Sequence, residues 1–287
     1  MPPISRILMP VDFSQRCLGM IPYLKYFARQ YSAEILLLHV VNPVYVIPET
    51  GISASAILSV PEWILTTQTN KIEEFGASEL RDFRVRRLVY EGDPEAQIVA
   101  TAEAEDVQLV IMPTRGYGVF RRFLLGSVAS KVLHDVGCPV LTGAHLKEQD
   151  ESGNIAISNI VCAIDRDAQS LETLKWASNL TADFQATLSI VHAMPRLDPS
   201  LAVSSDLKVE MEAIAREEIG NLQSAAAAKN VAVFIREGDV AHAVCGYATS
   251  VGADLVVIGR GKDRQMGRLR TNAYGIIRQS PCPVLSI

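Results

Sequence analysis

"ISRILMPVDFS" (residues 4–14) returns as "ISNIVCAIDRD" (residues 157–167), and this recurrence decides the fold. Asp12 pairs with Asp165 and His39 with His192 at one common offset. Repeats in constant order indicate a duplicated structural unit. Four more segments return in the same order: "AEILLLHVV" as "ATLSIVHAM", "VRRLVYEGDP" as "VAVFIREGDV", "EDVQLVIMPTRG" as "VGADLVVIGRG", and "HDVGCPVLTG" as "RQSPCPVLSI". We therefore predict two tandem domains, residues 1–145 and 155–287, joined by the polar linker "HLKEQDESGN" (145–154).

Within each repeat, short apolar runs alternate with segments of helical spacing. Runs such as "EILLLHVV" are continuously apolar, as in a parallel sheet that is covered on both faces. Strand and helix in alternation predict an α/β fold, a doubly wound five-stranded parallel sheet of Rossmann-like type in each domain. In the first repeat we expect strands at 6–11, 34–41, 84–91, 107–112 and 138–143, and helices at 14–32, 61–80, 94–106 and 127–137. Ser14 is the expected N-cap of the first helix, which Pro22 should kink.

Composition narrows the class of protein. The chain has 287 residues, 48% hydrophobic and 21% charged, which is typical of a folded protein and excludes general disorder. A net charge of −5 argues against nucleic acid as the main partner. The start "MPPISRILMPVDF" has no signal-peptide pattern, and no apolar run is long enough to span a membrane. The five cysteines lack metal-ligand spacing, so we expect reduced thiols in a cytoplasmic protein.

A ligand site is expected at the carboxyl ends of the strands, where such sheets bind ligands. Asp12 follows the first strand, and a glycine-containing loop after the fourth strand closes on Gly126 and Ser127. Ser127 suits an N-cap, and the free amides at a helix start attract anions. Asp12 can accept hydrogen bonds from a ribose or an adenine amine. Each residue alone is better explained as a helix cap, but their occurrence together with a glycine loop at matching strand ends favours a ligand site. The GxxxxGK[ST] and GxGxxG phosphate motifs are absent.

The segments "ILMPVDFS" and "LLGSVASKVLHDVGCPVL" resemble the universal stress protein (UspA-like) family in its tandem two-domain form. The resemblance covers nearly the whole chain and implies a regulatory protein of the stress response that binds ATP or another adenine nucleotide, with Mg²⁺ as a companion of the phosphates. Pro10 and Val40 would line the adenine slot, and Asp12 would hold the ribose or the adenine. The remaining implied contacts surround the phosphates: Met112, Arg115, Gly116, Gly126, Ser127 and Val128.

The chain departs from the family motif Gly-x2-Gly-x9-Gly-Ser/Thr in both repeats. Pro113 replaces the first glycine, which removes one amide donor. Arg115 can compensate by pairing with phosphate oxygens. In the second repeat Ala163 and Asp165 keep the adenine end, but Arg270-Thr271 stands at the Gly-Ser position. We therefore expect the nucleotide mainly in the first domain and a degenerate site in the second.

Three functions remain open on the sequence alone. The first is a nucleotide-responsive regulatory protein, in which slow ATP hydrolysis is the most that we expect of catalysis. The second is an interaction module of the same fold without nucleotide, and the third is an adenylate-using enzyme. No nucleophile or general base is apparent near His39 or His192, for which a structural role is favoured. The resemblance also implies that "PVLTG" pairs with "PVLSI" within the chain; homodimerisation is left open, and neither membrane nor nucleic acid is expected as a partner.

Overall fold

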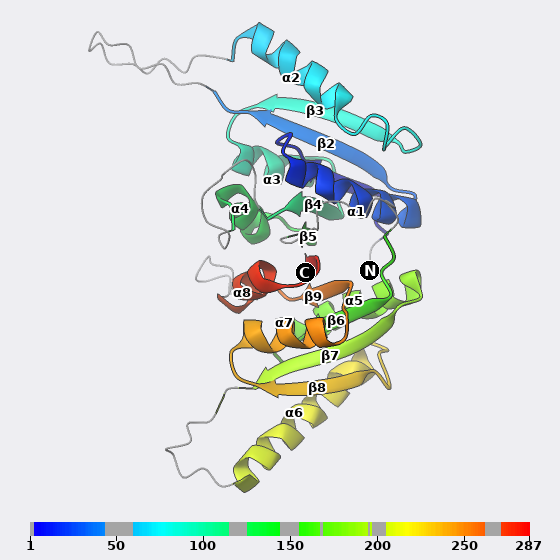
Figure 1. The fold of residues 1–287 in the computed structure, drawn as a ribbon, viewed down its shortest axis with the longest axis vertical. Coiled ribbons are helices and arrows are strands. Elements are labelled where there is room, and N and C mark those ends of the chain that lie inside the picture. Colours follow the sequence, from blue (N-terminus) through cyan, green and yellow to red (C-terminus); the bar gives the residue numbers. More distant parts are fainter. Residues whose placement is uncertain are drawn as a thin grey trace, which may run out of the picture. The chain divides into compact units, whose positions relative to one another are not determined.

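The computed structural model describes residues 3–43, 60–114, 125–143, 155–166, 169–194, 196, 205–261 and 271–287. The chain forms two compact units, the first built from β1–β4 with α1–α4 and the second from β5–β10 with α5–α8. Figure 1 shows strands alternating with helices in each unit, as the apolar runs predict. The α/β fold class is thereby confirmed.

The elements of the first repeat follow the expected order. They are β1 (Arg6–Pro10), α1 (Gln15–Tyr31), β2 (Glu34–Val41), α2 (Glu62–Glu74), β3 (Val85–Glu91), α3 (Pro94–Ala104), β4 (Leu109–Pro113), α4 (Ser127–Asp135) and β5 (Val140–Gly143). Helix α2 is shorter than expected from 61–80. It ends because Phe75 leaves the helical conformation and Gly76 takes a φ of 60°, a left-handed conformation that favours glycine.

The second repeat has the same alternation of elements. It comprises β6 (Asn159–Ala163), α5 (Ser170–Phe184), β7 (Thr187–Met194), α6 (Ser205–Ala225), β8 (Ala232–Glu237), α7 (Val240–Ser250), β9 (Leu255–Ile258), α8 (Thr271–Gln279) and β10 (Val284–Ser286). Within the described residues, no helix combines the length and the apolar character needed to cross a bilayer.

The strands of the first unit run parallel in the order β3-β2-β1-β4. The order reverses at β1, whose neighbours β2 and β4 lie on opposite sides. Such a reversal leaves a crevice at the carboxyl ends of β1 and β4, since the connections leave these two strands in opposite directions. The expected ligand site therefore corresponds to the carboxyl ends of β1 and β4 in the first unit.

The second unit has the parallel order β9-β6-β7-β8, with β10 beside β9. Strand β5 pairs antiparallel with β10, with Leu141 opposite Leu285, so "PVLTG" lies beside "PVLSI" as predicted. β5 belongs by sequence to the first repeat, but it is part of the compact unit that holds the second.

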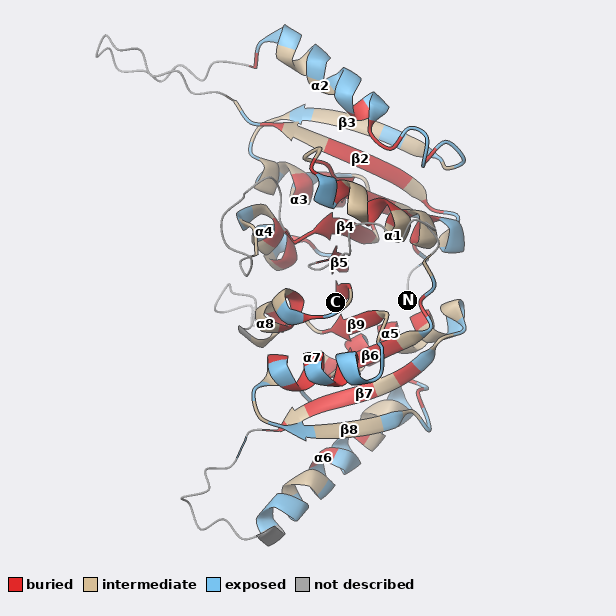
Figure 2. Cartoon of the chain, viewed as in Figure 1, coloured by how far each residue is buried: buried red, intermediate tan, exposed pale blue. Residues whose placement is uncertain are grey.

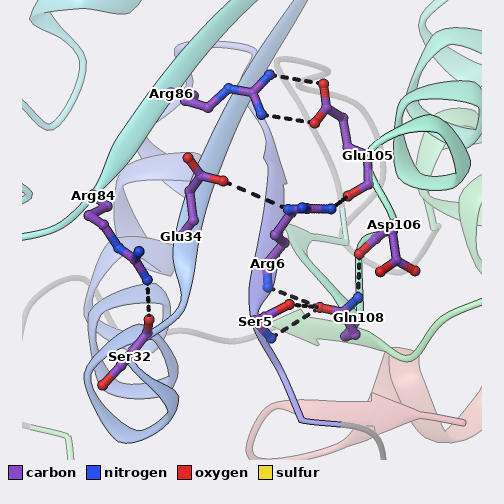
Figure 3. Close-up of polar contacts among 9 residues, drawn as sticks. All are labelled: Ser5, Arg6, Ser32, Glu34, Arg84, Arg86, Glu105, Asp106 and Gln108. Atoms are coloured by element: carbon purple, nitrogen blue, oxygen red, sulfur yellow. Dashed lines mark hydrogen bonds and ion pairs between the residues drawn. The ribbon is translucent and has the colours of Figure 1, made fainter.

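Apolar strands form the core, and polar side chains close its amino edge. In Figure 2 strand β2 is largely buried, whereas edge strand β3 is partly exposed. At the amino ends Gln108 accepts the backbone N–H groups of Ser5 and Arg6 at 3.0 Å each (Figure 3). Arg86 holds Glu105 through two bonds of 2.8 and 2.9 Å. These bonds pair the named polar groups of this edge with one another.

Candidate functional site

A cavity of about 290 Å³ opens at the carboxyl ends of β1, β2 and β4 in the first unit. It lies at the reversal of strand order, where the sequence predicts the site. Its lining residues come from the strand ends and from the first turns of α1, α3 and α4: Pro10, Val11, Asp12, Cys17, Leu38, His39, Val40, Pro94, Ile98, Met112, Pro113, Gly126, Ser127, Val128 and Ala129. Seven of the nine residues predicted for the site are among them.

The other two predicted residues, Arg115 and Gly116, lie outside the described part of the chain. Their proposed contact with phosphates remains a prediction. Pro113, the residue that replaces the first glycine of the motif, is the last residue of β4 and lines the cavity. Since proline has no N–H, it presents no amide donor there.

Asp12 is held at the cavity by a tight turn after β1. Phe13 takes a φ of 61°, an uncommon conformation for a residue other than glycine. The Ser14 backbone N–H donates to Asp12 Oδ1 at 2.9 Å, and Ser14 Oγ caps α1 by accepting the Cys17 N–H at 3.3 Å. The predicted cap at Ser14 is thereby confirmed. Asp12 itself does not cap α1, so the alternative explanation of Asp12 as a cap is wrong.

The start of α4 lacks a side-chain cap. Gly126, not Ser127, is its N-cap: Gly126 is extended (φ −66°, ψ 154°), and its carbonyl accepts the first helical bond from the Ser130 N–H at 2.9 Å. The prediction of Ser127 as N-cap is therefore wrong by one residue. Among the described residues, no acceptor binds the N–H groups of Ser127, Val128 or Ala129. Helices α1 and α3, in contrast, are capped by Ser14 and Asp93.

These amides concentrate positive potential at the cavity. The first N–H groups of a helix have no partner within the helix, and its dipole favours an anion there. The conformation of Gly126 is open to any residue, so backbone strain does not require glycine. The absence of Cβ does allow a ligand to approach the main chain closely.

The remaining walls are largely apolar. Pro10 ends β1, Val40 lies near the end of β2, and Met112 is buried in β4. Pro94 and Ile98, from the start of α3, complete this wall and were missed by the sequence reasoning. The sequence contained a signal for them, because β3 also ends at this edge and its connection leads directly into α3. An apolar slot beside an anion-binding helix start suits a flat base joined to a phosphate.

His39 lines the cavity and also joins two strand ends. Its Nδ1 lies 2.7 Å from the Val11 carbonyl oxygen, and its ring centre lies 4.5 Å from that of Phe13. Because a carbonyl only accepts, Nδ1 carries the proton. Burial lowers the pKa of His39, so the ring is neutral near pH 7. His192 makes the same contact with the Ile164 carbonyl at 2.8 Å, consistent with a shared structural role.

The matching crevice of the second repeat is nearly closed, with a cavity of about 30 Å³ that Ala163 and Asp165 line. The Gln169 side chain binds next to this cavity, because its partner Gly261 is one of the lining residues. Gln169 Oε1 accepts the Gly261 N–H at 2.7 Å, and Nε2 donates to the Ile287 carbonyl at 3.1 Å. The sequence attributed the degeneracy to Arg270, which lies outside the described residues; Gln169 was missed because nothing in its neighbourhood marks a glutamine as a crevice residue.

None of the five cysteines, all within the described residues, forms a disulfide. Burial raises the pKa of Cys17 and of Cys162 to about 12. Since the thiolate is the reactive form, neither sulfur is an activated nucleophile. Within the described residues, no group of three or more His, Cys, Asp or Glu side chains could hold a metal ion.

The fold and the site define a tandem α/β protein with one open strand-end crevice. The profile of the universal stress protein family matches residues 3–142 and again 156–287, and the chain belongs to this family. A universal stress protein of Methanocaldococcus jannaschii is 31% identical over 151 residues, which cover 48% of this chain and 93% of that protein. The Bacillus subtilis protein YxiE is 26% identical over 146 residues, covering 48% and 97%.

The two-repeat arrangement is also found among solved structures. The crystal structure of a universal stress protein from Archaeoglobus fulgidus matches 99% of this chain and 98% of its own, with a TM-score of 0.69 and 23% sequence identity. At this identity the match supports the fold alone.

Proposed function

We propose that the first repeat binds an adenine nucleotide and that the chain acts as a nucleotide-responsive regulatory protein. One observation carries the proposal: the uncapped start of α4 and the Asp12 carboxylate line the same cavity of about 290 Å³. The amides of Ser127 and Val128 would bind a phosphate, and Met112 would border it. Asp12 would accept hydrogen bonds from the sugar or the base, and Pro10 and Val40 would enclose the base.

The family resemblance supports ATP or a related adenine nucleotide as the ligand. Arg115 and Gly116 complete the proposed phosphate side. Mg²⁺ would arrive on the phosphates of the nucleotide. Binding would then bias partner association or assembly, because a ligand stabilises the conformation that it prefers. We propose no efficient catalysis, since the buried thiols and the neutral His39 offer no activated nucleophile.

The test is thermal unfolding of the full chain with and without ATP, ADP and AMP. A ligand that binds only the folded state raises the melting temperature. At a ligand concentration one hundred times Kd, the free energy of unfolding increases by about 2.7 kcal/mol. Gly126→Leu should abolish the shift, because its side chain would block the approach to the α4 amides. Gly137→Leu is the matched control: Gly137 is exposed just beyond the other end of α4, with nothing within 4 Å of an added Cβ.

A second candidate is an interaction module of the same fold without nucleotide. Pro113 favours it, because one amide donor of the family motif is lost in the cavity wall. Gln169 favours it also, since its side chain already accepts the Gly261 N–H beside the small second cavity. Unchanged melting with every adenine nucleotide, in a chain that still folds, would support this candidate over the first.

A further inference from the structure

The thiol of Cys17 lies in the wall of the cavity and contacts Asp12. We propose that Cys17 is a positioning residue for nucleotide recognition: its S–H holds Asp12 Oδ1, so that Asp12 Oδ2 receives the donors of the ligand. The inference rests on the proposed function and assigns to Cys17 a role that the family motif does not include.

The hydrogen bonds of Asp12 are unequally divided between its two oxygens. Oδ1 accepts the Ser14 N–H at 2.9 Å and the Cys17 thiol at 2.9 Å. Among the described residues, Oδ2 accepts nothing. A carboxylate oxygen has about two lone-pair sites, so Oδ1 is saturated and both sites of Oδ2 remain for a ligand.

Cys17 is well placed to fix the carboxylate. It lies in the first turn of α1, is 1% exposed, and its own N–H is held by Ser14 Oγ at 3.3 Å. The Pro10 carbonyl is a second acceptor at 3.6 Å, but the charged carboxylate is closer and stronger. Without the thiol, Asp12 keeps one bond and can rotate about its side chain.

The thiol stays protonated under working conditions, as a donor must. Burial, and next the negative charge of Asp12, raise the pKa of Cys17 to about 12. A thiolate beside Asp12 would repel it and offer no proton. This excludes the usual role of a cysteine near a ligand, that of a nucleophile, and leaves hydrogen bonding as its contribution.

The second repeat uses the matching position differently. Ser170 stands at the place of Cys17, and its Oγ accepts the Asp165 backbone N–H at 3.3 Å. Asp165 is exposed, whereas Asp12 is half-buried at the cavity. The repeat with the larger cavity therefore has a thiol, Cys17, bonded to the Asp12 carboxylate. The repeat with the smaller cavity has a hydroxyl, Ser170, that accepts the Asp165 backbone N–H.

The test is the affinity of the full chain for ATP, measured by calorimetry on wild type, Cys17→Ala and Cys17→Ser. The alanine variant loses the donor, and we expect binding to weaken roughly 3- to 10-fold, the effect of one weak bond to a charged group. The serine variant keeps a donor and should stay within about 2-fold of wild type. In an Asp12→Ala background, Cys17→Ala should have no further effect, because the acceptor that the thiol orients is gone.

A second readout does not depend on the nucleotide. The infrared S–H stretching band of Cys17, isolated by subtracting the Cys17→Ser spectrum, should move to higher frequency in Asp12→Asn. An unmoved band, or equal ATP affinity of wild type and Cys17→Ala, overturns the positioning role while nucleotide binding stands. Absence of ATP binding to the wild type overturns the proposed function itself, and the role of Cys17 with it.

Discussion

Phe13 shows how single residues shape the site. Its left-handed backbone turns the chain sharply after β1, so that Asp12 meets the N–H of Ser14 and the thiol of Cys17. Arg166, the matching residue of the second repeat, has the same conformation with a φ of 66°. The turn is thus a property of the repeat, and the open cavity comes from the side chains around it.

His39, which is half-buried, and His192, which is buried, make stability depend on pH. Burial lowers the folded pKa of His39 and His192, while the unfolded side chains titrate near about 6.5. Between the two pKa values the unfolded chain binds more protons, so stability falls as the pH drops below about 6.5. We expect the urea midpoint of the wild type to fall more between about pH 7 and pH 5 than that of His39→Asn/His192→Asn, whose amides can donate but do not titrate. Parallel pH curves for the two proteins would contradict this.

Helix α4 begins without a side-chain cap. In the proposed function its N-terminal amides would bind the ligand, whereas α1, α3 and α7 are capped by the side chains of Ser14, Asp93 and Asp239. Helices α2 and α5 share with α4 the lack of a side-chain cap. A helix end left without a cap costs stability, which the ligand would restore. At the amino ends of the strands, side chains accept the backbone N–H groups in both repeats. Gln108 accepts two of them in the first repeat, and Asp254 accepts two in the second.

Ser127→Asp should therefore change stability and binding in opposite directions. A carboxylate in the first turn interacts favourably with the helix dipole, worth about 0.3–1 kcal/mol. The same charge competes with phosphate for the amides, so nucleotide affinity should fall more than about 10-fold. Urea unfolding and calorimetry measure the two effects, and the neutral Ser127→Asn is the control. Unchanged affinity in Ser127→Asp would place the phosphate elsewhere.

The elements were predictable because continuous apolar runs and capping residues are local signals. The family resemblance implied Pro10, Val40 and Met112 as site residues, and the parallel order of the strands brings all three to one edge of the sheet. The bond between Cys17 and Asp12 could not be predicted, since it depends on the conformation of Phe13, which no local signal marks. The contacts of Gln169 could not be predicted either, because Gly261 and Ile287 lie far from it in the sequence.

The two repeats of the chain have strand-end cavities of unequal volume. One crevice measures about 290 Å³ and the other about 30 Å³. The exchange of β5 into the unit of the second repeat links the two copies through the chain itself.

Fragments test this exchange. Residues 139–287 contain β5, and residues 155–287 lack it. Val140 and Leu141 are fully buried in the structure, and their burial should make the longer fragment more stable by about 2–4 kcal/mol. Urea unfolding compares the two, with Leu141→Asp in the longer fragment as the control that should remove the gain. Equal midpoints for both fragments would show that β5 contributes nothing there.

Nucleotide binding by the first repeat is tested most directly by its stoichiometry in the full chain, measured by isothermal titration calorimetry with ATP, ADP and AMP. We expect saturable heat with at least one of them, at one site per chain. The heat should be lost in Gly126→Leu and retained in Gly137→Leu. No heat with any of the three, or two sites per chain that persist in Gly126→Leu, would contradict binding by the first repeat.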